Sequence, residues 1–118
     1  MAYRLEFYRT TRGDEPALEY IRAQAKAHRA KIGRALLYLT ELGHLARRPM
    51  ADYLGNGLYE LRIPADGHQH RLLYFFHERT VIVVTSAFLK NEEKVPPEEL
   101  TRAWRRNAEW LDRRVGEI

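Results

Sequence analysis

Three strand-like segments follow one another in the second half of the chain, and only short turns separate them. They cover residues 58–64, 68–76 and 81–89. The dipeptide Asp66-Gly67, between the first two, is typical of a tight hairpin turn. Because such short connections join neighbouring strands of opposite direction, the sequence predicts an antiparallel three-stranded meander.

The third segment predicts a strand in the interior of a sheet. Residues 81–84 are all β-branched, so apolar side chains point to both faces of the strand. A strand that is apolar on both faces is usually covered on both sides. We therefore expect residues 81–89 to form a central strand.

The stretch from residue 16 to residue 42 has apolar residues at helical spacing. One straight helix of this length would be about 40 Å long, which exceeds the roughly 35 Å expected across a domain of this size. We therefore predict two helices that bend back on each other, with the break between Lys26 and Gly33. Gly43 is the expected cap of the second helix.

The remaining segments complete one domain. Alternating apolar residues predict a half-buried strand at 3–9, residues 44–57 are expected to form a loop, and Pro96 begins a last helix rich in arginine. The order β-α-α-β-β-β-α predicts an α+β fold, an antiparallel sheet with its helices packed on one face. A chain of 118 residues has the length of one domain, so we assign residues 1–118 to a single domain.

Composition excludes several classes of function. The chain has no cysteine, which rules out a thiol nucleophile and a cysteine-ligated zinc site. His68 and His70 share one face of a predicted strand, but no third ligand has a matching spacing. We therefore expect exposed histidines and no bound metal or other cofactor. No apolar stretch approaches the roughly 20 residues of a membrane span, and the N-terminus does not resemble a signal peptide, so we expect a soluble, cytoplasmic protein.

The charge of the chain suits a polyanionic partner. The formal net charge is +4, and most of the 20 basic residues are arginines. Arginine binds phosphate through two parallel hydrogen bonds, which lysine does not do.

Two arginines interrupt otherwise apolar strand segments. Arg62 lies in the first segment of the meander and Arg71 in the second, where the hairpin should bring them close together, and Lys90 follows the third. Charged residues inside apolar strands are costly unless they are paired or functional. Two interpretations stay open. Either the three cations converge on one sheet face as a phosphate site, or an arginine forms a structural pair with Glu60.

Three stretches of the meander carry a family resemblance: Gly57-Leu58-Tyr59-Glu60-Leu61-Arg62, Arg71-Leu72-Leu73-Tyr74-Phe75 and Phe88-Leu89-Lys90. In this order they resemble the RelE/ParE toxin superfamily, and more closely its phage-derived Gp49-like branch, which includes HigB-type toxins. Lys94, Pro96 and the arginine-rich helix after them fit the same branch. The resemblance covers nearly the whole chain.

The resemblance implies a RelE-like fold and a small basic toxin of a type II toxin–antitoxin module. Many such toxins cleave messenger RNA on the ribosome without a metal ion, and an antitoxin, often of helix-turn-helix type, neutralises them. The resemblance places the catalytic cations at Arg62, Arg71 and Lys90. The expected partners are therefore mRNA, the ribosome and a cognate antitoxin.

These residue types suit that reaction. RNA cleavage without a metal requires the 2′-hydroxyl to lose its proton, the phosphorane charge to be stabilised and the 5′-oxygen to be protonated. Arg62 and Arg71 would hold the phosphate oxygens, and Lys90 would add charge or take part in proton transfer. His70 is a candidate base, but adjacent strand residues point to opposite faces, so we expect it to face away from Arg71.

Further RNA contacts are expected outside these three residues. Arg47 and Arg48 lie in the predicted loop and could bind the RNA backbone, and Lys94 follows the third strand. Tyr59 could stack on a base, although packing in the core is the more common role for such an aromatic residue.

Two alternatives stay open. The superfamily also includes ParE-like proteins that inhibit DNA gyrase without any chemistry, so fold alone does not decide the function. In addition, Asn91 stands where family members often have a second lysine. This residue is compatible with an inactive phage-derived remnant that still binds an antitoxin.

Overall fold

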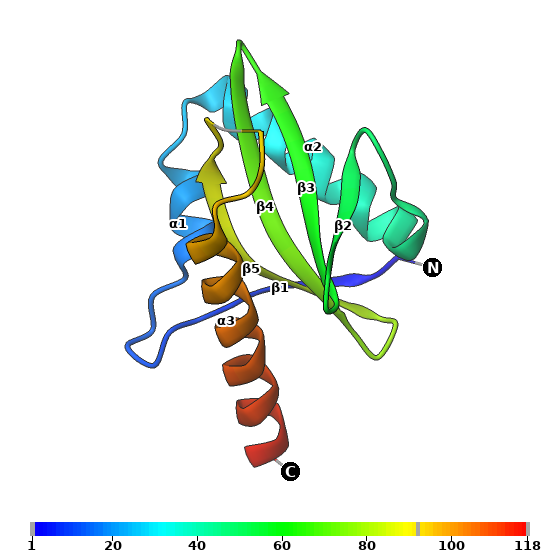
Figure 1. Ribbon diagram of the computed structural model, residues 1–118, viewed down its shortest axis with the longest axis vertical. Helices are drawn as coiled ribbons and strands as arrows, with labels where there is room; N and C mark the ends of the chain where they lie inside the picture. Colours follow the sequence, from blue (N-terminus) through cyan, green and yellow to red (C-terminus); the bar gives the residue numbers. More distant parts are fainter. Residues whose placement is uncertain (1, 92, 118) are drawn as a thin grey trace.

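The predicted meander forms the centre of a larger sheet (Figure 1). In the computed structural model, which describes residues 2–91 and 93–117, strands β3 (Leu58–Ala65), β4 (His68–His77) and β5 (Val81–Leu89) run antiparallel to one another. β5 has a strand on each side, and its first four side chains are buried. The expected central position of this strand is therefore confirmed.

Two outer strands extend the sheet to five, in the order β1-β5-β4-β3-β2. β1 (Arg4–Phe7) pairs with β5 in parallel, so the prediction of a wholly antiparallel sheet is wrong. The reason is that helices follow β1, and no tight turn ties it to a neighbouring strand. β2 (Ala51–Gly55) lies within the segment 44–57, for which a loop was predicted. The loop prediction is therefore wrong for residues 51–55. This strand has no alternating apolar pattern, and its antiparallel pairing with β3 holds it in place.

The two predicted helices cover one face of the sheet. They are α1 (Pro16–Arg22) and α2 (Lys26–Leu42). The break comes at Ala25, whose backbone is extended, and therefore just before the predicted interval from Lys26 to Gly33. The core on this side of the sheet includes Ile21, Ile32, Leu36, Leu39, Leu61, Leu72 and Ile82.

Gly43 ends α2, as predicted, and begins a short 3-10 helix (Gly43–Leu45). Its φ of +53° lies in the left-handed region that favours glycine. A Cβ atom at this position would lie 1.9 Å from an atom of the Tyr3 ring. Backbone conformation and close packing therefore both require glycine here.

The last helix, α3 (Pro97–Gly116), packs on the opposite face of the sheet, in front of it in Figure 1. The prediction that all helices share one face is therefore wrong. Leu72 points to α1 and α2, but Leu73 points to the other side, where Ala103 of α3 covers it. The predicted α+β class is confirmed. None of the helices among the described residues is long and apolar enough to cross a membrane.

Candidate functional site

Arg62 and Arg71 lie directly opposite each other in the β3–β4 ladder. Their neighbours Leu61 and Leu72 belong to the core beneath α1 and α2. Because adjacent strand residues point to opposite faces, both arginine side chains point to the face that α3 covers. The prediction that the hairpin brings these two arginines together is confirmed.

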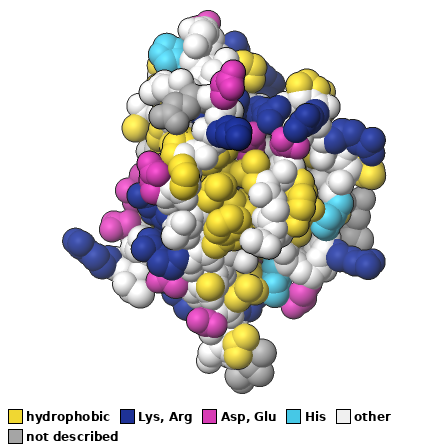
Figure 2. Space-filling view, viewed as in Figure 1, with side chains coloured by type: hydrophobic (Ala, Val, Ile, Leu, Met, Phe, Trp, Pro, Cys, Tyr) yellow, Lys and Arg dark blue, Asp and Glu magenta, His cyan; other side chains and the backbone are white. Residues whose placement is uncertain are grey.

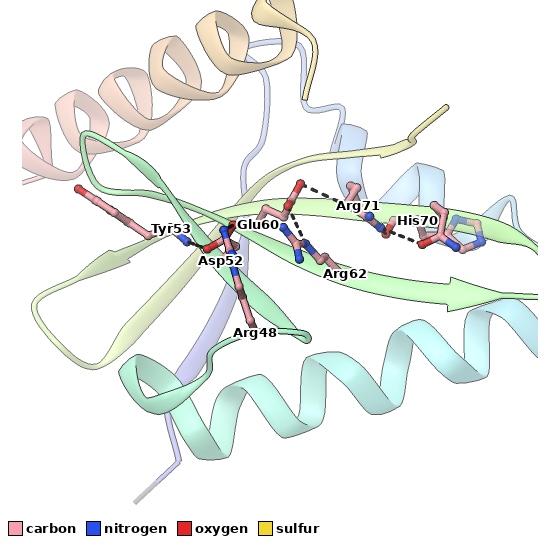
Figure 3. Close-up of polar contacts among 8 residues, drawn as sticks. Arg48, Asp52, Tyr53, Glu60, Arg62, His70 and Arg71 are labelled. Atoms are coloured by element: carbon pink, nitrogen blue, oxygen red, sulfur yellow. Dashed lines mark hydrogen bonds and ion pairs between the residues drawn. The ribbon is translucent and has the colours of Figure 1, made fainter. Parts of the chain in front are cut away.

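A buried carboxylate lies between the two guanidinium groups. Glu60 Oε1 accepts a hydrogen bond of 2.8 Å from Arg62 Nε, and Glu60 Oε2 lies 3.4 Å from Arg71 Nε (Figure 3). Only 1% of Glu60 is exposed. Like charges directly opposite each other destabilise a sheet, and this carboxylate offsets their repulsion. The structural pairing that the sequence left open is therefore present.

A second carboxylate extends this arrangement to β2. Asp52 Oδ2 accepts hydrogen bonds from Arg62 Nη2 at 3.1 Å and from Arg48 Nη2 at 3.0 Å. The hydrogen bond from Arg48 lowers the pKa of Asp52, so this residue stays ionised. Charges of alternating sign thus cross three strands in the order Arg48, Asp52, Arg62, Glu60 and Arg71, which we call the charge chain (Figure 3).

All members of the charge chain except Arg71 line a pocket of about 360 Å³, which we call the charged pocket. Four predicted site residues line it, and they are Arg48, Arg62, Lys90 and Lys94. The carboxylates that line it are those of Asp52, Glu60 and Glu93. Its apolar wall consists of Leu54, Val95 and Leu100. The pocket therefore combines an apolar surface with four cations and three carboxylates.

Charged and apolar side chains also lie next to each other on the wider surface of the face that α3 covers. In Figure 2, Lys and Arg side chains form a band across the upper part of the face, with Asp and Glu side chains between them. An apolar area lies directly below this band, in the centre of the same view.

Arg71 is deeper than the other predicted cations. It is 8% exposed, and it does not belong to the wall of the charged pocket. Burial lowers the pKa of its guanidinium, while Glu60 opposes this shift. Arg71 Nη1 donates a hydrogen bond of 3.0 Å to the His70 carbonyl oxygen. Arg71 is therefore linked to the pocket only indirectly, through its ion pair with Glu60, which lines the wall.

Two predicted RNA contacts lie outside the charged pocket. Arg47 is exposed but does not line it. Tyr59 points to the face of α2, where its ring stacks on that of Tyr74 at a centroid distance of 5.4 Å. This packing corresponds to the core role that the sequence analysis weighed against base stacking.

Sequence reasoning missed Asp52 because it placed this residue in a loop. A signal was available, since Gly55-Asn56-Gly57 is a strong turn sequence just before β3. A hairpin through this turn places Tyr53 opposite Tyr59 and Asp52 opposite Glu60, as the register of β2 and β3 shows.

A hydrogen-bonded chain of side chains occupies the other face of the sheet. His70 Nδ1 lies 2.7 Å from the Tyr20 hydroxyl, His70 Nε2 lies 2.8 Å from His28 Nδ1, and His28 Nε2 lies 3.1 Å from Asp66 Oδ2. In one consistent assignment both imidazoles are neutral and every bond runs in the same direction. The Tyr20 hydroxyl donates to His70 Nδ1, His70 Nε2–H donates to His28 Nδ1, and His28 Nε2–H donates to Asp66 Oδ2. His70 is 1% exposed, so the expectation of an exposed histidine is wrong. As expected, it faces away from Arg71.

Known proteins resemble this chain at two levels. The family described as phage derived protein Gp49-like (DUF891) matches residues 19–108, a range that contains the whole charged pocket. A chain in the crystal structure of the archaeal RelE-RelB complex from Pyrococcus horikoshii OT3 has a similar fold. The TM-score is 0.54 at 18% identity, and the match covers 78% of this chain and 99% of that chain. No curated protein sequence matches this one.

Proposed function

The chain belongs to the family of phage-derived Gp49-like proteins, and we propose that it acts as the toxin of a toxin–antitoxin pair. The proposed activity is metal-independent cleavage of messenger RNA on the ribosome, in the cytoplasm. The observation that carries this proposal is the charged pocket, in which cations from three separate segments surround a space next to an apolar wall.

The proposed ligand of the pocket is an RNA phosphodiester with its adjoining base. The phosphate would bind Arg62 and Lys90, and Lys94 and Arg48 would hold neighbouring phosphates at the rim. The apolar wall at Leu54, Val95 and Leu100 is suited to the flat surface of a base.

In the proposed reaction, the 2′-oxygen attacks phosphorus and the 5′-oxygen leaves. Arg62, together with the charge of Arg71 behind it, stabilises the phosphorane. Lys90 is the proposed proton donor to the leaving 5′-oxygen, since it lines the pocket at the end of β5. The 2′-hydroxyl passes its proton to solvent water as the bond to phosphorus forms, and the products are a 2′,3′-cyclic phosphate and a 5′-hydroxyl.

The proposed protein partner is a cognate antitoxin of helix-turn-helix type. Support comes from the fold, which is similar to that of a chain crystallised as a RelE-RelB complex. The excess of positive charge on the chain suits an acidic partner.

The test is induction of the chain without a partner gene in a bacterium, followed by mapping of transcript 5′ ends. We expect new ends within translated codons, and a loss of about 100-fold or more in Arg62→Ala and Lys90→Ala. Lys90 has no ion-pair partner within residues 2–91 and 93–117, so its removal should not disturb folding. Arg34→Ala, which removes an exposed arginine of α2, serves as the matched control.

Two other outcomes would replace the proposal. Growth arrest with intact messages would indicate a ParE-like inhibitor of DNA gyrase. Absence of arrest would indicate an inactive remnant that binds an antitoxin.

A further inference from the structure

We propose that Glu60 is a positioning residue of the charged pocket, whose carboxylate fixes Arg62 and Arg71 relative to each other and offsets part of their attraction for phosphate. The inference rests on the proposed function, because it names the residue that orients the proposed phosphate-binding cations. It starts from the charge chain, in which Glu60 is the carboxylate that contacts both arginines.

Both arginines are also held from their outer sides. Arg71 donates to the His70 carbonyl oxygen at 3.0 Å. Arg62 donates through Nη2 to Asp52 at 3.1 Å, and Asp52 in turn pairs with Arg48. Glu60 therefore closes a continuous set of contacts, and neither guanidinium can move without breaking one of them.

These contacts leave one part of Arg62 available to a ligand. Its Nε donates to Glu60 and its Nη2 to Asp52, whereas Nη1 has no acceptor among the described residues. A guanidinium has a planar fork of five N–H groups, so fixing two of its nitrogens also fixes the direction of the third. The two carboxylates thus orient Nη1.

Removal of the carboxylate charge should affect binding and cleavage in opposite directions. Glu60→Gln keeps the volume of the side chain but removes its charge, so the two guanidiniums attract a phosphate in the pocket more strongly. We expect RNA to bind about threefold to tenfold more tightly, because one opposing charge is lost at close range. A neutral amide no longer fixes the two guanidiniums, so the bound phosphate would be misplaced, and cleavage at saturating RNA should fall about 10- to 100-fold.

The experiment measures binding and single-turnover cleavage separately. Binding uses RNA with a 2′-deoxy nucleotide at the cleavage position, and the variants are Glu60→Gln and Glu60→Asp. Glu60→Asp keeps the charge but shortens its reach, so we expect slower cleavage with unchanged affinity. Glu41→Gln, on the exposed side of α2, is the control for loss of one carboxylate elsewhere. Wild-type rates in both Glu60 variants, or parallel losses of affinity and rate in Glu60→Gln, would overturn the inference.

A second measurement does not depend on RNA cleavage. Inorganic phosphate should raise the melting temperature of Glu60→Gln by several degrees more than that of the wild-type protein. In Glu60→Gln/Arg71→Met, which lacks one of the two cations, this additional response should disappear. Equal responses in the wild-type protein and Glu60→Gln would refute the inference. If the wild-type chain does not cleave RNA, the proposed function fails, and the phosphate response alone decides the role of Glu60.

Discussion

A carboxylate as deeply buried as that of Glu60 is rare in proteins unless it is paired. Its pairing with Arg62 and Arg71 does not by itself indicate a gain in stability. Replacing buried ion pairs with apolar residues of similar volume is often neutral or even stabilising. Stability alone therefore does not account for the charge chain at this position, which is consistent with a role for it in binding.

A different residue should make the stability of the protein depend on pH. Burial lowers the pKa of His70 below its ordinary value of 6.5, and the neighbouring imidazoles of His28 and His68 lower it further. The unfolded chain then binds a proton here at a pH at which the folded chain does not. The contribution of neutral His70 is complete above about pH 6.5 and is lost as the pH falls toward the lower pKa of the folded state.

Urea unfolding at pH 7.5 and at pH 5.0 measures this effect. We expect the free energy of unfolding to fall by an amount on the order of 1 kcal/mol between these pH values. His70→Gln should remove most of this dependence, whereas His44→Gln, at an exposed position, should retain it. An unchanged slope in His70→Gln would show that other groups cause the acid sensitivity.

At the scale of elements, two glycines of the α2 region should respond in opposite ways to alanine. Gly43 has a positive φ, and a Cβ there would meet the Tyr3 ring at 1.9 Å. Gly43→Ala should therefore cost about 2 kcal/mol or more in unfolding free energy. Gly33 lies within α2 with no atom within 4 Å of an added Cβ, so Gly33→Ala should stabilise by about 0.5–1 kcal/mol. Urea unfolding of both variants makes this comparison, and a stable Gly43→Ala protein would contradict the packing described for the end of α2.

The elements also show what could be predicted from sequence. The meander was predictable because β-branched runs and tight turns are local signals. The predicted hairpin was enough to place Arg62 and Arg71 next to each other. β2 was not, because its residues gain strand structure through pairing with β3 and not through their own pattern. The hydrogen bonds of Asp52 and the contact of His28 with His70 depend on tertiary packing between distant segments, which no local pattern encodes.

At the scale of the whole molecule, the sheet separates two kinds of polar chemistry. The charge chain lies on the face of α3, and the hydrogen-bonded histidines lie on the face of α1 and α2. The two sets meet in β4, where the carbonyl oxygen of His70 accepts a hydrogen bond from Arg71. Placement of a helix on each face makes both sets possible, because each is then partly shielded from water.

The distribution of positive charge should appear in the salt dependence of RNA binding. Each phosphate that a cation neutralises on single-stranded RNA contributes about −0.7 to the slope of log K against log salt concentration. Lys94→Ala, at an exposed position of the pocket rim, should reduce the magnitude of the slope by about this amount. Titration of a fluorescent RNA at several salt concentrations provides the slope, with Arg34→Ala as the control. An identical slope in Lys94→Ala would place the phosphates elsewhere on the surface.

The strand order has a consequence for the time at which the charged pocket forms during synthesis of the chain. β1 leaves the ribosome before the other strands, but its partner is β5, so this edge of the sheet remains incomplete until residue 84 has emerged. The charged pocket is completed later still, when Lys94 and Leu100 join residues of β2 and β3. A nascent chain therefore has no finished pocket until residue 100 has emerged from the ribosome, and a chain terminated before that residue never acquires one.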